Sequence, residues 1–279
     1  MENAVCAFCG KNNTRKWCES EGLDVVKCSC GMIYPNPRLS PDEISRGYNS
    51  NRLSGVDDYL EVAEGNKHDF RKRFDLIEEY SHKGGMLDVG CNIGSAMDVA
   101  ESRGWVCSGI DVNKNAVQVA RKKGLNARVG QLEDSKGLYD LIFMNDVIEH
   151  VPNPRKELGL AKKLLRGGGV LYISTPDGGS LMARLSRGRW LHLKPRQHLY
   201  IFNRDNLRMI LEEKGFKVLY LSSVGRTRKI STIVKKMRTY SESMASILSF
   251  VLHPLTEKTI SINLFDEIQV LARKENETI

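Results

Sequence analysis

The sequence predicts an α/β protein with a seven-stranded, mainly parallel sheet that carries helices on both faces. From Met86 onward, short apolar runs alternate with segments of helical spacing, which is typical of a parallel sheet. A glycine-containing turn joins the first of these runs directly to a helix, and later helices end at Gly104 and Gly124. A small cysteine-rich module precedes this sheet.

Length and charge limit the possibilities. The chain has 279 residues, enough for one large domain and a small module. We find no apolar run of the roughly 20 residues that cross a bilayer and no secretory signal, so we expect a cytoplasmic protein. Lys and Arg number 42 against 34 Asp and Glu, a net charge of +8. This excess suits a nucleic acid, an anionic lipid surface or a phosphorylated substrate, and equally a solvated basic surface.

Five of the seven cysteines lie in the first thirty residues. In a reducing compartment such a cluster indicates a metal before disulfides. Cys6 and Cys9 form one close pair, Cys28 and Cys30 another, and together they supply four thiolates for a structural zinc ion. Cys18 is an alternative ligand, and reduced, unliganded thiols are the alternative state. We expect this zinc module over residues 1–38.

Residues 39–83 are expected to form a helical linker or cap. Ser40-Pro41 has the pattern of a helix start, and a second helical run extends from Tyr59 to Tyr80, before Gly84-Gly85.

Residues 84–279 are expected to form the main domain, with an insertion at about 224–258. Its predicted strands are Met86–Val89, Val106–Ile110, Ala127–Val129, Leu141–Met144, Val170–Ser174, Val218–Leu221 and Glu267–Ala272. Its predicted helices are Ser95–Arg103, Asn113–Lys123, one that starts after Asn153, and Asn203–Lys214. Within the insertion, Lys229–Leu252 has apolar residues at helical spacing and basic residues opposite. This predicted helix is a packed lid over the substrate, a dimer face, or a peripheral membrane contact.

The segment Leu87–Ser95 carries the sharpest chemical signal. Gly90 and Gly94 allow close approach of a ligand to the backbone beyond a strand end, but the spacing is not that of a dinucleotide loop. Asp88 would repel a pyrophosphate and suits a cationic amino group. Asp111 ends the next strand, where an acid typically holds ribose hydroxyls. These features describe a ligand with a ribose, a cationic amino-acid tail and no phosphates.

From about Met86 to Phe216, these residues resemble the class I S-adenosylmethionine-dependent methyltransferases, whose fold is Rossmann-like. The resemblance also covers Gly130–Asp134, Tyr139–Phe143, Asn145–Val151 and Leu164–Ser174. It implies that S-adenosylmethionine is the cofactor. The residues that it implies for binding are Asp88, Gly90, Asn92, Gly94, Asp111, Val112, Gln131, Leu132, Asn145 and Asp146. Asn92 stands where the family usually has glycine, and asparagine tolerates the left-handed conformation better than most residues.

The cysteine module is similar to the zinc-ribbon heads of a subgroup of these enzymes, which includes sugar methyltransferases. There, too, a second cysteine pair leads into an aromatic-Pro-x-Pro-Arg segment, here Tyr34–Arg38. That pair more often has two intervening residues, whereas only Ser29 intervenes here. The sugar C-methyltransferases of the subgroup carry a further C-terminal domain that we do not expect in this chain, which favours O-methylation.

Methyl transfer needs an aligned nucleophile and, for a hydroxyl, a base. His150 follows the fourth predicted strand and is either that base or a residue that shapes the cofactor pocket. His198 lies in a segment similar to the family's His-Leu-x-x-Phe element at the substrate cleft, and His192 is a third candidate. Basic residues near Trp190 could grip a phosphorylated or carboxylated acceptor, or be solvated surface.

The leading hypothesis is O-methylation of a small molecule or saccharide, for which a nucleotide- or lipid-linked sugar is a plausible acceptor. The alternative is an RNA base methyltransferase in which the zinc ribbon recognises RNA. The ribbon lacks the dense basic cluster and aromatic platform that this would need, and Asn145-Asp146-Val147-Ile148 replaces the Asn-Pro-Pro-Tyr motif of amino-group methylation. A third hypothesis is a cofactor-binding scaffold whose ribbon recruits a partner.

Overall fold

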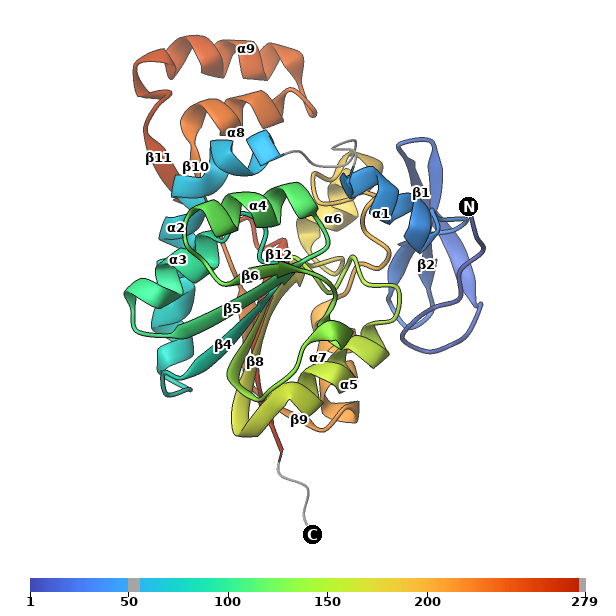
Figure 1. Cartoon of the computed structure of the whole chain (residues 1–279). Helices are drawn as coiled ribbons and strands as arrows, with labels where there is room; N and C mark the ends of the chain where they lie inside the picture. The colour runs from blue at the N-terminus through green and yellow to red at the C-terminus, as the bar shows by residue number, and fades with distance from the viewer. Residues whose placement is uncertain (50–55, 276–279) are drawn as a thin grey trace.

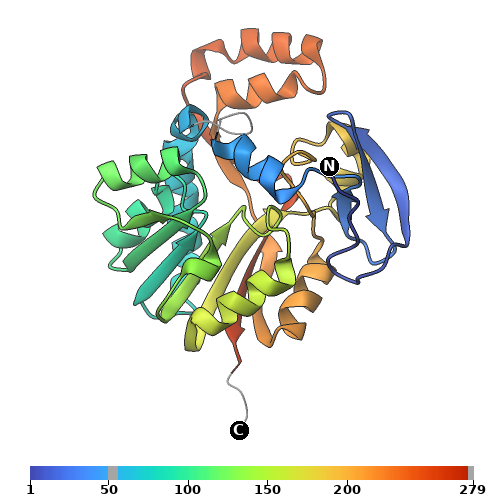
Figure 2. The same ribbon diagram turned by 45° about the vertical axis from the view of Figure 1, so that its right-hand side comes forward.

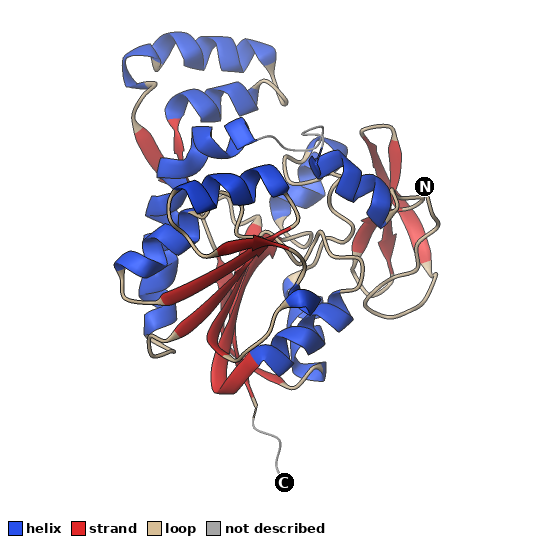
Figure 3. Cartoon of the chain, viewed as in Figure 1, coloured by secondary structure: helices blue, strands red, loops and turns tan. Residues whose placement is uncertain are grey.

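A computed structural model describes residues 1–49 and 56–275. Its centre is a seven-stranded sheet in the order β6-β5-β4-β7-β8-β12-β9, drawn in red in Figure 3. The strands are β4 (Gly85–Val89), β5 (Val106–Asp111), β6 (Ala127–Val129), β7 (Tyr139–Asn145), β8 (Leu165–Pro176), β9 (Phe216–Ser223) and β12 (Glu267–Lys274). Strands β4 to β8 run parallel, and β12 is antiparallel to both of its neighbours. The predicted α/β fold with a mainly parallel seven-stranded sheet is therefore confirmed.

Helices cover both faces of this sheet (Figure 1). One face carries α2 (Val56–Glu78), α3 (Ser95–Ser102) and α4 (Lys114–Lys122), and the other carries α5 (Pro154–Leu164) and α7 (Arg204–Glu213). Side chains alternate between the faces along each strand. In β8, Val170 and Tyr172 join the core under α2, whereas Leu171 and Ile173 join the core under α5 and α7.

Local signals set the ends of these elements. Gly104 and Gly124, which follow α3 and α4, have φ angles of 95° and 87°, values that glycine adopts without the steric cost of a Cβ. Pro154 opens α5, and the Asn153 side chain accepts a hydrogen bond from Lys156 N at 3.0 Å. For α3, α4 and α7, the predicted boundaries therefore differ from the observed ones by only one residue.

The cysteine-rich segment forms a three-stranded antiparallel sheet of β1 (Thr14–Ser20), β2 (Leu23–Cys28) and β3 (Ile33–Pro35). It lies to one side of the main sheet, beside the segment that contains α6 (Leu181–Ser186), as Figure 2 shows. Ile33 and Ile201 exchange backbone hydrogen bonds of 3.2 and 2.8 Å. Met32 and Tyr34 belong to the same buried cluster as Leu199. The small sheet is thus packed on the main domain, and α1 (Pro41–Asn49) follows it.

The insertion is where the sequence prediction fails. A single helix over Lys229–Leu252 is wrong: β10 (Arg226–Lys229) precedes two helices, α8 (Ile230–Met237) and α9 (Glu242–Val251), and β11 (Thr259–Ile262) pairs antiparallel with β10. The break between the helices has its own cap, because the Ser241 side chain accepts a hydrogen bond from Met244 N at 3.3 Å. The two helices stand above α2, outside the sheet layers (Figure 1). We call α8 and α9 the helical arm.

Among the described residues, no helix has both the length and the apolar character that spanning a membrane requires.

Candidate active site

The turn after β4 has the backbone conformation that the sequence predicts for it. Gly90, Asn92 and Gly94 have φ angles of 72°, 53° and 80°, in the left-handed region that favours glycine and, next to it, asparagine. A Cβ on Gly90 would lie 2.6 Å from Cγ2 of Val147, in the segment after β7. Since real atoms do not approach so closely, this position accepts only glycine without a shift of the neighbouring segment.

Asp111 holds this turn against the end of β5. Its Oδ2 accepts a hydrogen bond from Asn92 N at 2.9 Å, and its Oδ1 accepts one from Asn113 N at 2.7 Å. Burial raises the pKa of Asp111, although these backbone amides oppose the shift. Each carboxylate oxygen keeps a second lone pair, so Asp111 can fix the loop and still accept hydrogen bonds from a ligand.

Asp88 lies one residue before the end of β4 and is only 2% exposed. Its Oδ2 is buried and has no hydrogen-bond partner among the described residues. Burial raises the pKa of Asp88 well above its ordinary value, and the nearby Asp111 raises it further. A buried carboxylate in this state is stabilised by a cation, so its chemistry fits the α-amino group of a bound S-adenosylmethionine.

The remaining predicted cofactor residues follow the neighbouring strands. Gly130 N donates to Asp111 O at 3.1 Å, which places the next turn beside β5. In that turn Gln131 is exposed, and Leu132 packs in the main core. Val112 is 39% exposed. At the end of β7, Asn145 Oδ1 accepts from Ser174 Oγ at 2.8 Å, so these residues, like Asp88 and Asp111, lie at the carboxyl ends of the parallel strands.

Asp146 has a partner that the sequence did not reveal. It follows β7 in a left-handed conformation with φ of 56°, and both of its carboxylate oxygens accept from Arg226 at 2.9 and 2.8 Å. Burial alone would raise the pKa of Asp146, but Arg226 and then Arg73 outweigh it and lower that pKa. Arg226 also pairs with Glu267. No motif marked Arg226, which lies 80 residues away in the sequence.

Two of the predicted histidines meet next to Asp146. The rings of His150 and His198 are 4.7 Å apart at 85°, and Glu149, which the sequence analysis did not select, offers a ligand atom in the same cluster. Burial lowers the pKa of His150 to about 4, with partial opposition from the Gln197 carbonyl. Burial, followed by His150, lowers the pKa of His198 well below its ordinary value. Both rings are therefore neutral near pH 7.

His192 belongs to a separate group. Its Nε2 lies 3.1 Å from Glu267 Oε1, and its ring is 5.6 Å from that of Trp190. Trp190 is buried and donates from Nε1 to Asp266 Oδ2 at 2.9 Å. His192 thus faces Asp266 and Glu267, at the start of β12, whereas His150 and His198 face Glu149.

The four predicted metal ligands converge. Sγ of Cys6 lies 3.4 Å from Sγ of Cys30, and Sγ of Cys9 lies 3.5 Å from Sγ of Cys28. All four sulfur atoms lie within 4.8 Å of one another. Cys18 is outside this group and packs near Trp190.

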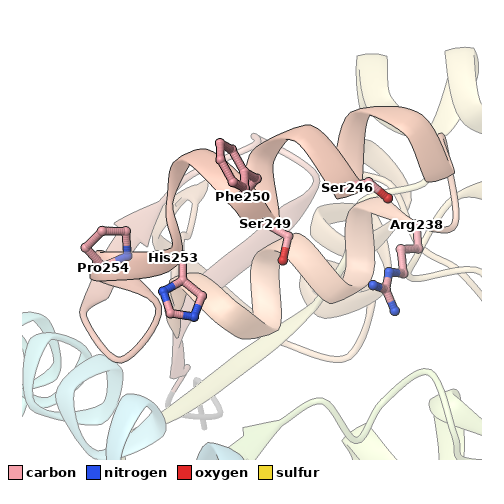
Figure 4. A pocket seen from close by; sticks show the side chains of 6 residues that line it. All are labelled: Arg238, Ser246, Ser249, Phe250, His253 and Pro254. Carbon is pink, nitrogen blue, oxygen red and sulfur yellow. The ribbon is translucent and has the colours of Figure 1, made fainter.

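A surface pocket lies on the helical arm (Figure 4). Its lining residues are Arg238, Ser246, Ser249, Phe250, His253 and Pro254. None of these residues lies at the carboxyl edge of the sheet, and they form no cluster of titratable groups. The strand ends are therefore the better candidate for the catalytic site.

Comparisons with known proteins agree with this geometry. The model of a family described as "Methyltransferase domain" matches residues 65–221, more than half of the chain. The ubiquinone biosynthesis O-methyltransferase of Erwinia tasmaniensis is 30% identical over 124 residues, which cover 40% of this chain and 51% of that protein. The matched region thus spans about half of the relative's length.

Solved structures share the fold at low identity. A methyltransferase of Thermotoga maritima, described as S-adenosylmethionine-dependent and a possible histamine N-methyltransferase, matches with a TM-score of 0.54 and 15% identity, over 84% of this chain and 99% of that one. Phosphoethanolamine N-methyltransferase 2 of Haemonchus contortus, solved with S-adenosylhomocysteine and phosphomonomethylethanolamine, matches with a TM-score of 0.57 and 16% identity, over 88% and 62%.

The fold and the strand-end site define the class I S-adenosylmethionine-dependent methyltransferases. The chain belongs to the methyltransferase-domain family.

Proposed function

We propose that the protein methylates an oxygen atom of a small molecule or saccharide, with S-adenosylmethionine as the methyl donor. The observation that carries the cofactor part is the buried, unpartnered Oδ2 of Asp88 beside the Asp111-anchored loop. In this proposal Asp88 and the loop that follows it hold the amino-acid part of the cofactor. Asp111 and Val112 border its ribose. Gln131 and Leu132 border the adenine.

The acceptor part of the proposal rests on the residues after β7. Asn145 and Asp146 would border the methyl group, and His150 and His198 stand next to them as neutral imidazoles at pH 7. A neutral imidazole accepts a proton or a hydrogen bond, as an acceptor hydroxyl requires. The matched relatives include O-methyltransferases that, by name, act in ubiquinone biosynthesis, which supports a small-molecule acceptor.

We also propose that residues 1–38 form a structural zinc module and residues 39–83 a helical connection to the catalytic domain. Four thiolates around a zinc ion at about 2.3 Å would lie about 3.8 Å apart, close to the sulfur–sulfur distances of 3.4 and 3.5 Å. Four protein ligands fill the coordination shell, so this zinc would stabilise the module and would not activate water. The helical arm is then the candidate lid over the acceptor.

The first test is calorimetric titration of the zinc-loaded protein with S-adenosylhomocysteine. Saturable binding supports the cofactor site, and no binding by folded protein refutes it. Transfer of a labelled methyl group to a panel of nucleotide sugars, other hydroxylated small molecules and RNA then tests the acceptor class. Label in RNA, with none in the small molecules, would contradict the proposed acceptor.

A further inference from the structure

We propose that the helical arm docks on an anionic phospholipid membrane through the outer face of α9. The arm stands above α2, outside the layers of the main sheet, and α9 is its outer helix (Figures 1 and 2). This helix has ten residues, so it is about 15 Å long and would lie along a bilayer surface instead of crossing it. Membrane binding does not depend on the proposed methyl transfer.

The outer face of α9 is apolar and exposed. Four large side chains, spaced three, four and seven positions apart, share this side of the helix, and each is more than half exposed: Met244, Ile247, Phe250 and Val251. Ala245, on the opposite side, is fully buried where α9 packs on α8. Residues 243–252 include no charged side chain. An exposed apolar patch of this kind marks a surface that is stabilised by contact with lipid or protein.

The pocket beside this face supplies hydrogen-bond donors for a phosphate. Phe250 lines the pocket and also belongs to the apolar face, and Figure 4 shows Arg238 at one end of the pocket and His253 at the other, with two serines between them. Nε of Arg238 lies 3.5 Å from Oε1 of Glu242, but both side chains are more than half exposed, and such a pair is weak. A guanidinium has five N–H donors and binds phosphate well. The pocket therefore complements the phosphate of a lipid headgroup, next to the side chains that would enter the acyl region.

The charge of the arm complements an anionic surface. Residues 226–263, which include the arm and the two strands at its root, contain seven Lys and Arg against two Asp and Glu. Basic residues near an exposed apolar face favour anionic over neutral lipid. The net charge of +8 on the whole chain acts in the same direction.

A second copy of the chain fits this face less well than a membrane does. A stable protein–protein interface takes about 20–30 residues from each partner, whereas four large apolar side chains form the outer face of α9, on a helix about 15 Å long. A lipid surface has no such minimum, because each inserted side chain contributes in proportion to its own apolar area.

Docking through α9 would bring the membrane to the acceptor side of the molecule. Arg226 begins β10 at the root of the arm and pairs with Asp146 after β7 at 2.8 Å, so the arm rises from the carboxyl edge of the sheet. A lipid-linked acceptor would then meet the site at the bilayer surface. This last step rests on the proposed function.

The test is flotation of the zinc-loaded, full-length protein with vesicles in a density gradient. Vesicles of equal parts phosphatidylglycerol and phosphatidylcholine are compared with vesicles of phosphatidylcholine alone, and the protein should bind the anionic vesicles at least tenfold more tightly. Phe250→Ser should weaken this binding about tenfold or more, because Phe250 is the most exposed side chain of the face, at 86%. Arg238→Ala should weaken it severalfold and reduce its dependence on salt.

Met209→Ser is the matched control for Met244→Ser. Met209 on α7 is 55% exposed and Met244 on α9 is 54% exposed, so the two variants remove the same side chain from two different surfaces, and only Met244→Ser should weaken vesicle binding. Equal loss in both variants would overturn the proposal, as would wild-type protein that does not float or that binds both kinds of vesicle equally.

Two further measurements on the same samples complete the test. A wild-type dimer in sedimentation that Phe250→Ser dissociates, together with no vesicle binding, would overturn the proposal and assign the face to a second copy of the chain. Titration with S-adenosylhomocysteine separates this proposal from the proposed function: flotation without cofactor binding supports membrane docking and refutes the methyltransferase assignment of the strand-end loop.

Discussion

Replacement of Asp111 by alanine should weaken S-adenosylhomocysteine binding by roughly tenfold to a thousandfold. The carboxylate accepts from Asn92 N at 2.9 Å and from Asn113 N at 2.7 Å, and in the proposed complex it also accepts from ribose hydroxyls. A hydrogen bond to a charged group contributes about 1.5–3 kcal/mol. Loss of one or two of them, partly replaced by water, corresponds to about 1.4–4 kcal/mol of binding free energy.

Asp140→Ala is the matched control for this experiment. Asp140 lies at the opposite end of the same sheet, near the start of β7, and its Oδ2 likewise accepts a backbone hydrogen bond, from Gly85 N at 2.8 Å. We expect this variant to lose stability and keep its affinity for S-adenosylhomocysteine in calorimetry. Wild-type affinity in Asp111→Ala, or an equal loss in Asp140→Ala, would refute the assigned role of Asp111.

Three further predictions concern stability. Elemental analysis should find one zinc ion per chain. Cys30→Ser should lose this ion and lower the Tm, whereas Cys18→Ser, which is outside the cluster, should keep both. Retention of zinc by Cys30→Ser would exclude the four-cysteine site. Glu78 accepts from Arg103 at 2.9 and 2.8 Å and from Trp105 at 3.1 Å, and chiefly the Arg103 interaction lowers its pKa from 4.5. The contribution of ionised Glu78 to stability is therefore present above pH 4.5 and lost as the pH falls through the lowered pKa. In urea unfolding, Glu78→Gln should lower the free energy of unfolding by about 1.5–3 kcal/mol at pH 7 and by progressively less below pH 4.5. An equal loss at pH 7 and below pH 4.5 would contradict this role. Phe143 stacks on Phe74 and Tyr172 at 5.5 and 4.7 Å, so Phe143→Ala should lower the free energy of unfolding by about 3–5 kcal/mol, against less than about 0.5 for the exposed Leu138→Ala.

The elements that the sequence predicted well are those with local signals. Every predicted strand of the main sheet is observed because each contains a short apolar run, the pattern that a strand buried in a sheet produces in the sequence. The helical arm was predicted as one helix instead of two because no glycine or proline lies between Met237 and Ser241 to mark the break. Its break depends on the Ser241 cap and on pairing of β10 with β11. Such non-local pairing has no signature within a short window of sequence.

The same distinction applies to the site. The Asp88 and Asp111 positions are tied to strand ends and so were visible in the sequence. The pairing of Asp146 with Arg226 and the contact of His150 with His198 join residues 80 and 48 positions apart, respectively. The two histidines were selected as separate candidates for a base, and Glu149 was overlooked beside His150. Only the packing of the segment before α7 against the end of β7 brings these residues together.

Arg226 also limits how the helical arm can move. It begins β10, at the root of the arm, and it pairs with Asp146 after β7 and with Glu267 at the start of β12. The next residue, Thr227, donates its backbone amide to both carboxylate oxygens of Asp69 on α2 at 2.9 Å. These ion pairs are partly buried, with Arg226 25% and Asp146 28% exposed, so solvent screens them only in part. A closure that carries β10 along would have to break these contacts, so closure of α8 and α9 over an acceptor must pivot beyond Lys229, where the strand gives way to the helix.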